Sequence, residues 1–169
     1  MKSESRSSAG SSRHYACPEE HHQHSLDELL KNVSQICAQK GLRLTDVRKR
    51  VLTLIWQAQS PIGAYALLEI LQQHQTNAKP PTIYRALDFL LEHRFIHRIS
   101  SLNAYIACAH PEYHHSAYFF ICKSCNASFE ISHPALDQTI EQAVQPFGCR
   151  IENKIIEVTG LCKTCLLTK

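Results

Sequence analysis

Three features of the sequence predict an α+β fold made of two units. Apolar residues follow helical spacing from residue 25 to about residue 93, two short strand patterns come next, and two Cys-x-x-Cys motifs lie in the last third. Helices followed by a β-hairpin are typical of the winged-helix variant of the helix-turn-helix, and paired Cys-x-x-Cys motifs are typical of zinc sites. We therefore expect a winged-helix DNA-binding domain at residues 25–102 and a small α/β domain with structural zinc at residues 103–169.

The composition of the 169-residue chain excludes several classes of protein. Apolar residues make up 44% and charged residues 20%, which is enough for a packed core. No apolar run approaches the roughly 18 residues of a transmembrane helix, and the polar, Ser-rich N-terminus does not resemble a secretory signal peptide. We expect a cytoplasmic protein with no membrane partner, in which eight cysteines and eleven histidines favour metal binding over disulfides.

Positive charge and potential metal ligands lie in different parts of the sequence. Residues 25–102 contain ten Lys or Arg against six Asp or Glu, whereas residues 103–169 contain five against six. A basic segment next to a metal-rich one indicates a nucleic-acid-binding module beside a metal-dependent unit. Residues 1–24 have balanced charges and few apolar residues, which predicts a disordered tail.

The helical segment divides at recognisable boundaries. Ser25 is a suitable N-cap with Glu28 completing a capping box, Thr45 is a second N-cap, and Gly41 can end the first helix. Pro80-Pro81 provides a favourable helix entry. The expected helices are residues 25–40, 45–58, 64–74 and 82–93.

The second half of the chain contains strand patterns and one further helix. Two strands joined by a turn at residues 101–103 would form the wing. Two more strands flank the first Cys-x-x-Cys motif, and the last strand precedes the second. The expected strands are residues 95–100, 103–108, 117–122, 127–132 and 150–159, with a helix at 133–144.

The paired Cys-x-x-Cys motifs are the strongest local signal in the sequence. Their four thiolates match the closed tetrahedral sites in which zinc is structural. A redox dithiol is the alternative, but a redox motif would need no second copy near the C-terminus. We expect a structural zinc bound by Cys122, Cys125, Cys162 and Cys165.

A second set of potential ligands surrounds the expected wing. Two imidazoles, one thiolate and one carboxylate suit zinc, and the thiolate disfavours manganese and magnesium. The residue types alone leave open a half-buried histidine and a small core cysteine that bind no metal. The set comprises His97, Cys108, His115 and Glu130, with His110 and His114 as neighbouring loop residues.

The sequence closely resembles the ferric-uptake-regulator superfamily over residues 26–166, and within it the zinc uptake regulator branch. The resemblance rests on the string KPPTIYRALDFL at residues 79–90, on FIH at 95–97, on YIAC at 105–108 and on the two Cys-x-x-Cys motifs. It implies a repressor, not an enzyme, that binds double-stranded operator DNA of zinc-uptake genes as a homodimer. In that branch DNA binding requires a regulatory zinc, and residues 103–169 would form the dimerisation domain.

The resemblance also assigns roles to individual residues. The four cysteines match the structural zinc site, and His97, Cys108, His115 and Glu130 match the regulatory zinc site, which gives two Zn²⁺ per chain. Arg85 suits bidentate recognition of guanine, and Tyr84 suits contact with phosphate or a thymine methyl group. The expected DNA-binding residues are Tyr65, Lys79, Thr82, Tyr84 and Arg85.

Three alternatives to a zinc-responsive repressor differ in the residues that they would require. An iron- or peroxide-responsive regulator of the same superfamily would build its site from His and carboxylate, and Cys108 argues against it. A zinc hydrolase would need a general base beside an open metal position. A zinc-buffering protein would need no basic recognition helix.

Overall fold

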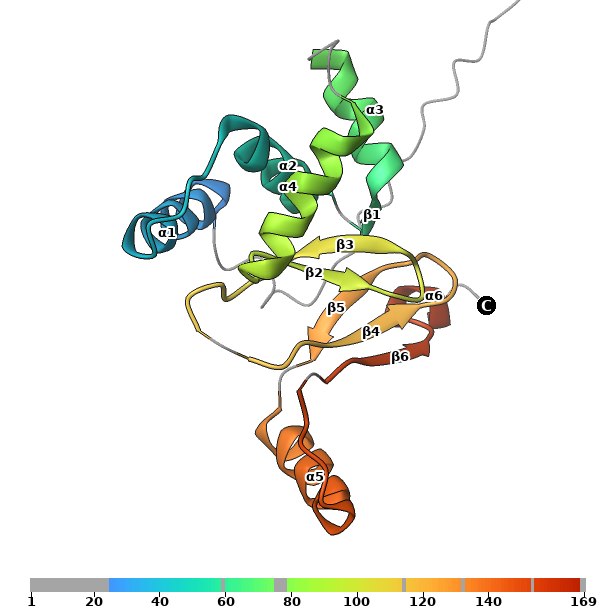
Figure 1. Ribbon diagram of the computed structural model, residues 1–169. Helices are drawn as coiled ribbons and strands as arrows, with labels where there is room; N and C mark the ends of the chain where they lie inside the picture. The colour runs from blue at the N-terminus through green and yellow to red at the C-terminus, as the bar shows by residue number, and fades with distance from the viewer. Residues whose placement is uncertain are drawn as a thin grey trace, which may run out of the picture.

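The computed structural model describes residues 25–58, 60–74, 79–113, 115–131, 133–152 and 154–167. The expected tail at residues 1–24 and the loop residue His114 lie outside this part of the chain. The expected α+β class is confirmed: four helices and a three-stranded sheet form the N-terminal part of the described chain, and a second three-stranded sheet follows (Figure 1). None of the helices described here combines the length and the apolar character needed to cross a membrane.

The four N-terminal helices begin and end close to the expected positions. Ser25 and Glu28 form the expected capping box, with the Ser25 backbone N–H donating to Glu28 Oε2 at 2.8 Å. Thr45 caps the second helix, and Gly41 adopts a φ of 64° just after the first. The helices are α1 (Leu26–Gln39), α2 (Asp46–Gln57), α3 (Ala64–His74) and α4 (Pro80–Glu92).

Helix α4 begins two residues earlier than expected. Pro80 and Pro81 form its first turn. Backbone N–H groups in the first turn of a helix have no intrahelical acceptor, so proline costs no hydrogen bond there. One apolar core holds this helix against the other three, with fully buried leucines on α2, α3 and α4: Leu52, Leu67 and Leu87. Each such side chain contributes roughly 1.5–3 kcal/mol of burial free energy, so the opposite face of α4 is held outward.

The first sheet is the wing, and it contains a strand that the sequence did not predict. Its strands are β1 (Ile62–Gly63), β2 (Ile96–Ile99) and β3 (Ala104–Ala107), in the order β1-β3-β2 and all antiparallel. Strand β1 is too short to show an alternating pattern. Because β2 and β3 exchange backbone hydrogen bonds, the expected division between residues 102 and 103 cuts through this hairpin.

The second sheet has one parallel and one antiparallel strand pair. Its strands are β4 (Tyr118–Cys122), β5 (Ser128–Ile131) and β6 (Ile156–Gly160), in the order β5-β4-β6 with β4 and β6 parallel. The crossover from β5 to β6 contains α5 (Pro134–Val144) and a 3₁₀ turn (Gln145–Phe147). The last strand begins at Ile156 instead of residue 150, and the short α6 (Lys163–Leu167) was not predicted.

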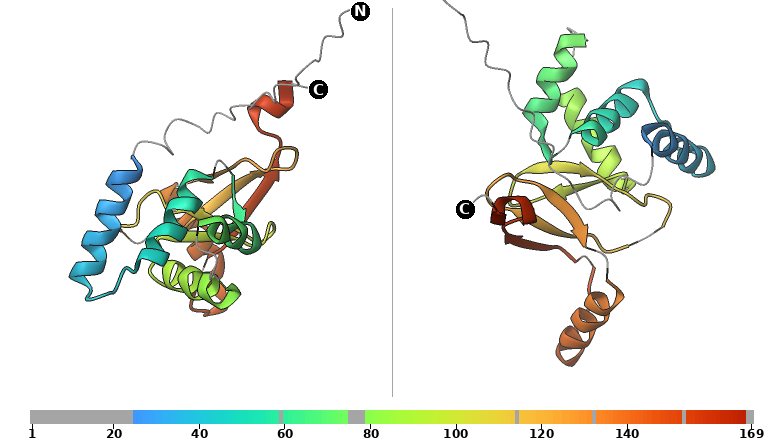
Figure 2. Two further views of the ribbon diagram at one scale, coloured as in Figure 1. Left: turned by 90° about the horizontal axis from the view of Figure 1, so that it is seen from above. Right: turned by 180° about the vertical axis from the view of Figure 1, so that it is seen from behind.

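Helix α5 projects away from both sheets (Figure 2). Its expected apolar positions include Leu136 and Ala143, which are both exposed. The wing, by contrast, packs directly on the second sheet, where Ile99 lies in one apolar cluster with Phe119 and Ile121. The wing and β4 therefore share an apolar contact surface, whereas neither apolar cluster of the described residues includes a residue of α5.

We expect Gly160→Ala to destabilise the second sheet. A Cβ atom at Gly160 would lie 3.0 Å from Cε2 of Phe120, whose ring is stacked on Phe129 at a centroid distance of 4.9 Å. Displacing the ring should lower the free energy of unfolding by about 1–3 kcal/mol, measurable by urea unfolding of the zinc-loaded protein.

Gly63→Ala is the matched control in a strand of the wing. The nearest atom to its added Cβ would be the Asn103 carbonyl oxygen at 3.9 Å, an ordinary contact, so stability should stay equal or rise slightly. Equal stability of the two variants would show that the close approach at Gly160 is not required.

Candidate metal centres and nucleic-acid interface

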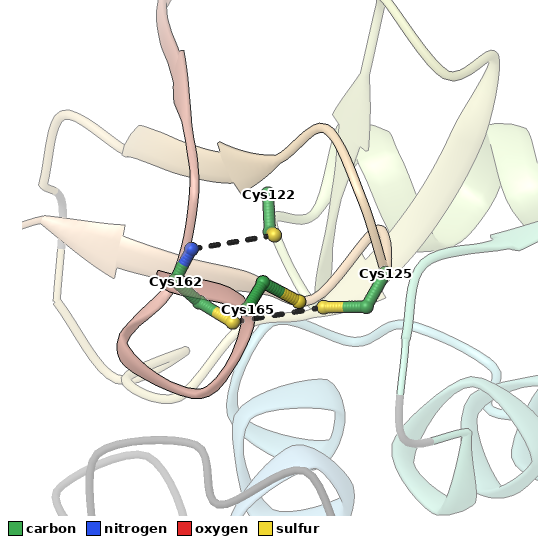
Figure 3. Close-up of side chains that lie close together, drawn as sticks. All are labelled: Cys122, Cys125, Cys162 and Cys165. Carbon is green, nitrogen blue, oxygen red and sulfur yellow. Dashed lines mark hydrogen bonds between the residues drawn. The ribbon is translucent and has the colours of Figure 1, made fainter. Parts of the chain in front are cut away.

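The parallel pairing of β4 and β6 brings the two Cys-x-x-Cys motifs together. Cys122 ends β4 and lies opposite Gly160, so Cys162 follows two residues later beside it. The four sulfur atoms lie within 4.8 Å of one another, and Cys125 Sγ is 3.8 Å from Cys162 Sγ (Figure 3). All four predicted cysteines therefore meet at one point.

Backbone N–H groups favour the thiolate form of Cys122, whereas burial raises the pKa of Cys125. The Cys162 N–H donates to Cys122 Sγ at 3.3 Å. Burial alone would raise the pKa of Cys122, but N–H groups of Cys162, Cys125 and Ser124 lower it to about 6. The thiolate is the form that binds metal, and four sulfur donors with no open position fit a structural zinc.

The second cluster joins the wing to the C-terminal sheet. His97 lies on β2, Cys108 directly follows β3, and His115 precedes β4; their ligand atoms lie within 4.8 Å of one another. His115 Nε2 is 3.7 Å from Cys108 Sγ and 2.8 Å from Glu130 Oε1 on β5. The structure thus brings together all four residues expected at the second zinc site.

The electrostatics of this cluster fit a metal site. Among the described residues, His97 Nε2 is buried without a hydrogen-bond partner, and burial lowers the pKa of His97 to about 4. A buried polar atom without a partner costs roughly 1–3 kcal/mol, and a neutral imidazole nitrogen is a zinc ligand. Cys108 is fully buried beside His115, and its sulfur would be a soft donor to a metal bound there.

The other histidine described near this cluster points to a different partner. His110 Nδ1 is 3.4 Å from Glu112 Oε1, and its ring stacks on Tyr113 at a centroid distance of 5.3 Å. His110 therefore lies beside the ligand set without joining it, as expected for a loop residue.

A carboxylate that the sequence analysis missed fixes the segment next to His115. Asp137 Oδ1 on α5 accepts hydrogen bonds from Ser116 Oγ at 2.7 Å, Tyr118 OH at 2.9 Å and Lys154 Nζ at 2.6 Å. These donors, Lys154 first, lower the pKa of Asp137 to about 2. The network ties α5 to the start of β4, and no local spacing could have indicated it.

The expected DNA-binding residues lie on the exposed side of α3 and α4. Tyr65 is 75% exposed and Tyr84 is 43% exposed, and both line one surface hollow together with Arg98 of the wing. Lys79, at the N-cap of α4, and Arg85 are exposed, while Thr82 is half-buried. The buried apolar face of α4 thus leaves its N-terminal half free to face a ligand.

Comparison with known proteins assigns this architecture to a family. Residues 39–159 match the model of the ferric uptake regulator family. The chain is 39% identical over 140 residues to the zinc uptake regulation protein of Escherichia coli (strain K12), covering 82% of each chain. It is 27% identical over 134 residues to the ferric uptake regulation protein of Staphylococcus aureus, covering 78% of this chain and 93% of that one.

Solved structures lead to the same assignment. A structure described as a zinc uptake regulator complexed with zinc and DNA has a TM-score of 0.82 at 37% identity, over 86% of this chain and 98% of that one. The crystal structure of holo XcZur has a TM-score of 0.77 at 36% identity, over 85% and 99% of the two chains. This chain belongs to the ferric uptake regulator family.

Proposed function

We propose that this protein is a zinc-responsive repressor that binds operator DNA as a homodimer and controls zinc-uptake genes. The observation that carries the proposal is the convergence of His97, Cys108, His115 and Glu130 from the wing and the C-terminal sheet. Strand β2, which carries His97, directly follows α4. A ligand shared by these elements would therefore fix the direction in which α4 faces.

The relatives support a zinc-dependent DNA-binding function. The Escherichia coli relative is a zinc uptake regulation protein, and the neighbour with a TM-score of 0.82 contains zinc and DNA. We propose two zinc ions per chain: a structural one held by the four cysteines and a regulatory one held by the mixed ligand set. When bound, the regulatory zinc would cross-link the wing to the C-terminal sheet and favour dimers whose two α4 helices match two half-sites.

We assign different roles in DNA binding to the exposed residues of α3 and α4. Arg85 offers a planar guanidinium for bidentate contact with guanine, and Tyr84 offers a hydroxyl and a ring. Lys79 lies at the entry of α4, where an ammonium group suits a phosphate. We assign to Tyr65 and Thr82 contacts with the sugar-phosphate backbone of the DNA.

The C-terminal half carries the apolar surface that a dimer needs. Phe147 and Leu167 are each 78% exposed, and Ile155 is 65% exposed. These side chains lie on the crossover between α5 and β6 and on α6, and a second chain that covered them would remove large apolar side chains from water. We therefore propose dimerisation through the C-terminal domain and place its start after β3, because β3 belongs to the wing sheet. We further propose that the dimer acts in the cytoplasm, where operator DNA is accessible.

The alternatives have less support. An iron-responsive regulator would not favour a buried thiolate ligand such as Cys108, and the identity to the ferric uptake regulation protein is lower, at 27% against 39%. A zinc hydrolase is disfavoured by membership of a family of uptake regulators.

Cys108→Ser should separate the two metal sites. The serine hydroxyl is a poor zinc ligand, so this variant should keep one zinc per chain and remain dimeric, yet lose zinc-stimulated binding to operator DNA. Cys122→Ser should instead lose the structural zinc and unfold more readily, because structural zinc binding contributes on the order of 10 kcal/mol to folding. Zinc content, sedimentation and DNA binding measure the three properties. A Cys108→Ser protein that still requires added zinc for operator binding would contradict the assignment.

Zinc affinity at the regulatory site should rise with pH. Burial raises the pKa of Cys108, and hydrogen bonds with Cys108 and Glu130 raise that of His115, so both groups carry protons that zinc must displace at neutral pH. Release of one or two protons corresponds to roughly a ten- to hundredfold gain in affinity per pH unit between about 6 and 8. Competition of the native protein with a zinc chelator at several pH values measures the slope. A flat profile in the native protein would argue against these ligands.

Arg85→Ala and Lys79→Ala should affect DNA binding in different ways. Loss of a bidentate base contact should cost about 1–3 kcal/mol at one base pair and relax discrimination there, whereas loss of a phosphate contact should weaken binding to all sequences and reduce the salt dependence. Binding to matched and singly mismatched duplexes at several salt concentrations separates the two effects. Native discrimination in Arg85→Ala would show that another residue reads the sequence.

A further inference from the structure

A carboxylate on the last strand reaches across to the tip of the wing. Glu157 Oε1 accepts the backbone N–H of Ser100 at 2.6 Å, and Glu157 Oε2 accepts that of Ser101 at 3.0 Å. The Ser101 side chain also favours the ionised form of this carboxylate. Both serines lie in the turn between β2 and β3, so one side chain accepts two backbone N–H groups of the wing turn from 56–57 residues away.

Glu157 belongs to the same row of the C-terminal sheet as the regulatory site. Phe119 of β4 is in register with Glu130 of β5 on one side and with Glu157 of β6 on the other. Side chains in register on neighbouring strands point to the same face of a sheet. The row Glu130–Phe119–Glu157 therefore faces the wing, and Phe119 in its centre contacts the apolar cluster that contains Ile99.

The two ends of this row hold the wing by different means. Glu130 contacts His115 in the mixed cluster, whereas Glu157 accepts backbone N–H groups. Burial would raise the pKa of Glu157, but the donors of Ser101 and Ser100 hold it below its ordinary value. The carboxylate is thus ionised at neutral pH, and a charged acceptor makes stronger hydrogen bonds than a neutral one.

We propose that Glu157 is a positioning residue that holds the wing against the C-terminal sheet independently of metal. The contact favours the arrangement in which His97, Cys108, His115 and Glu130 meet, so less of the zinc binding free energy is needed to select it. This inference rests on the proposed zinc-responsive function. It predicts that loss of the contact raises the zinc concentration needed for DNA binding. The arrangement in which the four ligands meet would be less populated, and the apparent affinity for zinc falls in proportion to that population.

The test compares variants of the full-length dimer on one DNA probe. The probe is a duplex selected by the native protein from a random-sequence library at saturating zinc. Glu157→Gln replaces one acceptor oxygen with an NH₂ group that faces a backbone donor. We expect its free-zinc midpoint for DNA binding to rise about three- to tenfold, the effect of losing a hydrogen bond to a charged group at a partly exposed site. The number of zinc ions per chain and the DNA affinity at saturating zinc should stay unchanged.

Two further variants distinguish positioning from a general effect on stability or charge. Ser101→Ala keeps both backbone donors and removes only the hydroxyl that favours the ionised carboxylate, so it should shift the midpoint in the same direction by a smaller factor and add little when combined with Glu157→Gln. Glu152→Gln is the control for charge: this exposed carboxylate lies in the same domain, and its removal should leave the midpoint unchanged within about twofold.

Each outcome decides a different point. A native midpoint in both Glu157→Gln and Ser101→Ala would overturn the positioning role, and Ser101→Ala alone decides it if Glu157→Gln does not fold. An equal shift in Glu152→Gln would also overturn it, because charge alone would then explain the effect. If the native protein shows no zinc-dependent DNA binding, the proposed function is wrong. Amide hydrogen exchange at Ser100 and Ser101 then decides the contact: faster exchange in Glu157→Gln supports it, and unchanged exchange refutes it.

Discussion

The parallel pairing of β4 with β6 is the constraint on which the arrangement of the C-terminal half depends. Its register places Cys122 opposite Gly160, so Cys162 lies beside the first Cys-x-x-Cys motif. Parallel strands cannot be joined by a tight turn, so the chain between them must cross over, and α5 lies in that crossover. Four thiolates at the ends of the two strands would hold the pair together when they share one metal, which links metal binding to folding in this half of the chain.

The two metal clusters differ in what they connect. The four cysteines come from the same end of one small sheet, where the parallel strands β4 and β6 both finish, so their meeting requires only that this sheet is formed. The mixed cluster requires β2 and the end of β3 to lie against β4 and β5, and it includes a buried His97 nitrogen without a protein partner in the described structure. Such a nitrogen raises the free energy of the metal-free arrangement and so makes ligand binding more favourable. This suits a site that responds to its metal.

Local features of the sequence predicted most elements, and long-range features were missed. Capping by Ser25 and Thr45 and the two Cys-x-x-Cys motifs depend on spacings of a few residues, and the structure confirms both caps and the clustering of the cysteines. Strand β1 exists only because Ile62 and Gly63 pair with β3, which no local pattern shows. The contacts of Asp137 and Glu157 join residues 17–21 and 56–57 positions apart, so they follow from sheet register and not from sequence spacing.

The row Glu130–Phe119–Glu157 explains how one sheet face can serve both a fixed and a variable contact. Phe119 supplies apolar contact that depends on neither metal nor pH. Glu157 binds backbone N–H groups, which do not titrate, so its contact persists wherever the carboxylate is ionised. Glu130 instead contacts His115, which can hold a proton or bind a metal but not both through the same nitrogen. The contact that changes with metal or protonation is thus confined to Glu130 at one end of the row. Glu157 and Phe119 hold the wing in place in either state. The free-energy difference between the two arrangements of the wing, which metal binding must supply, therefore stays small.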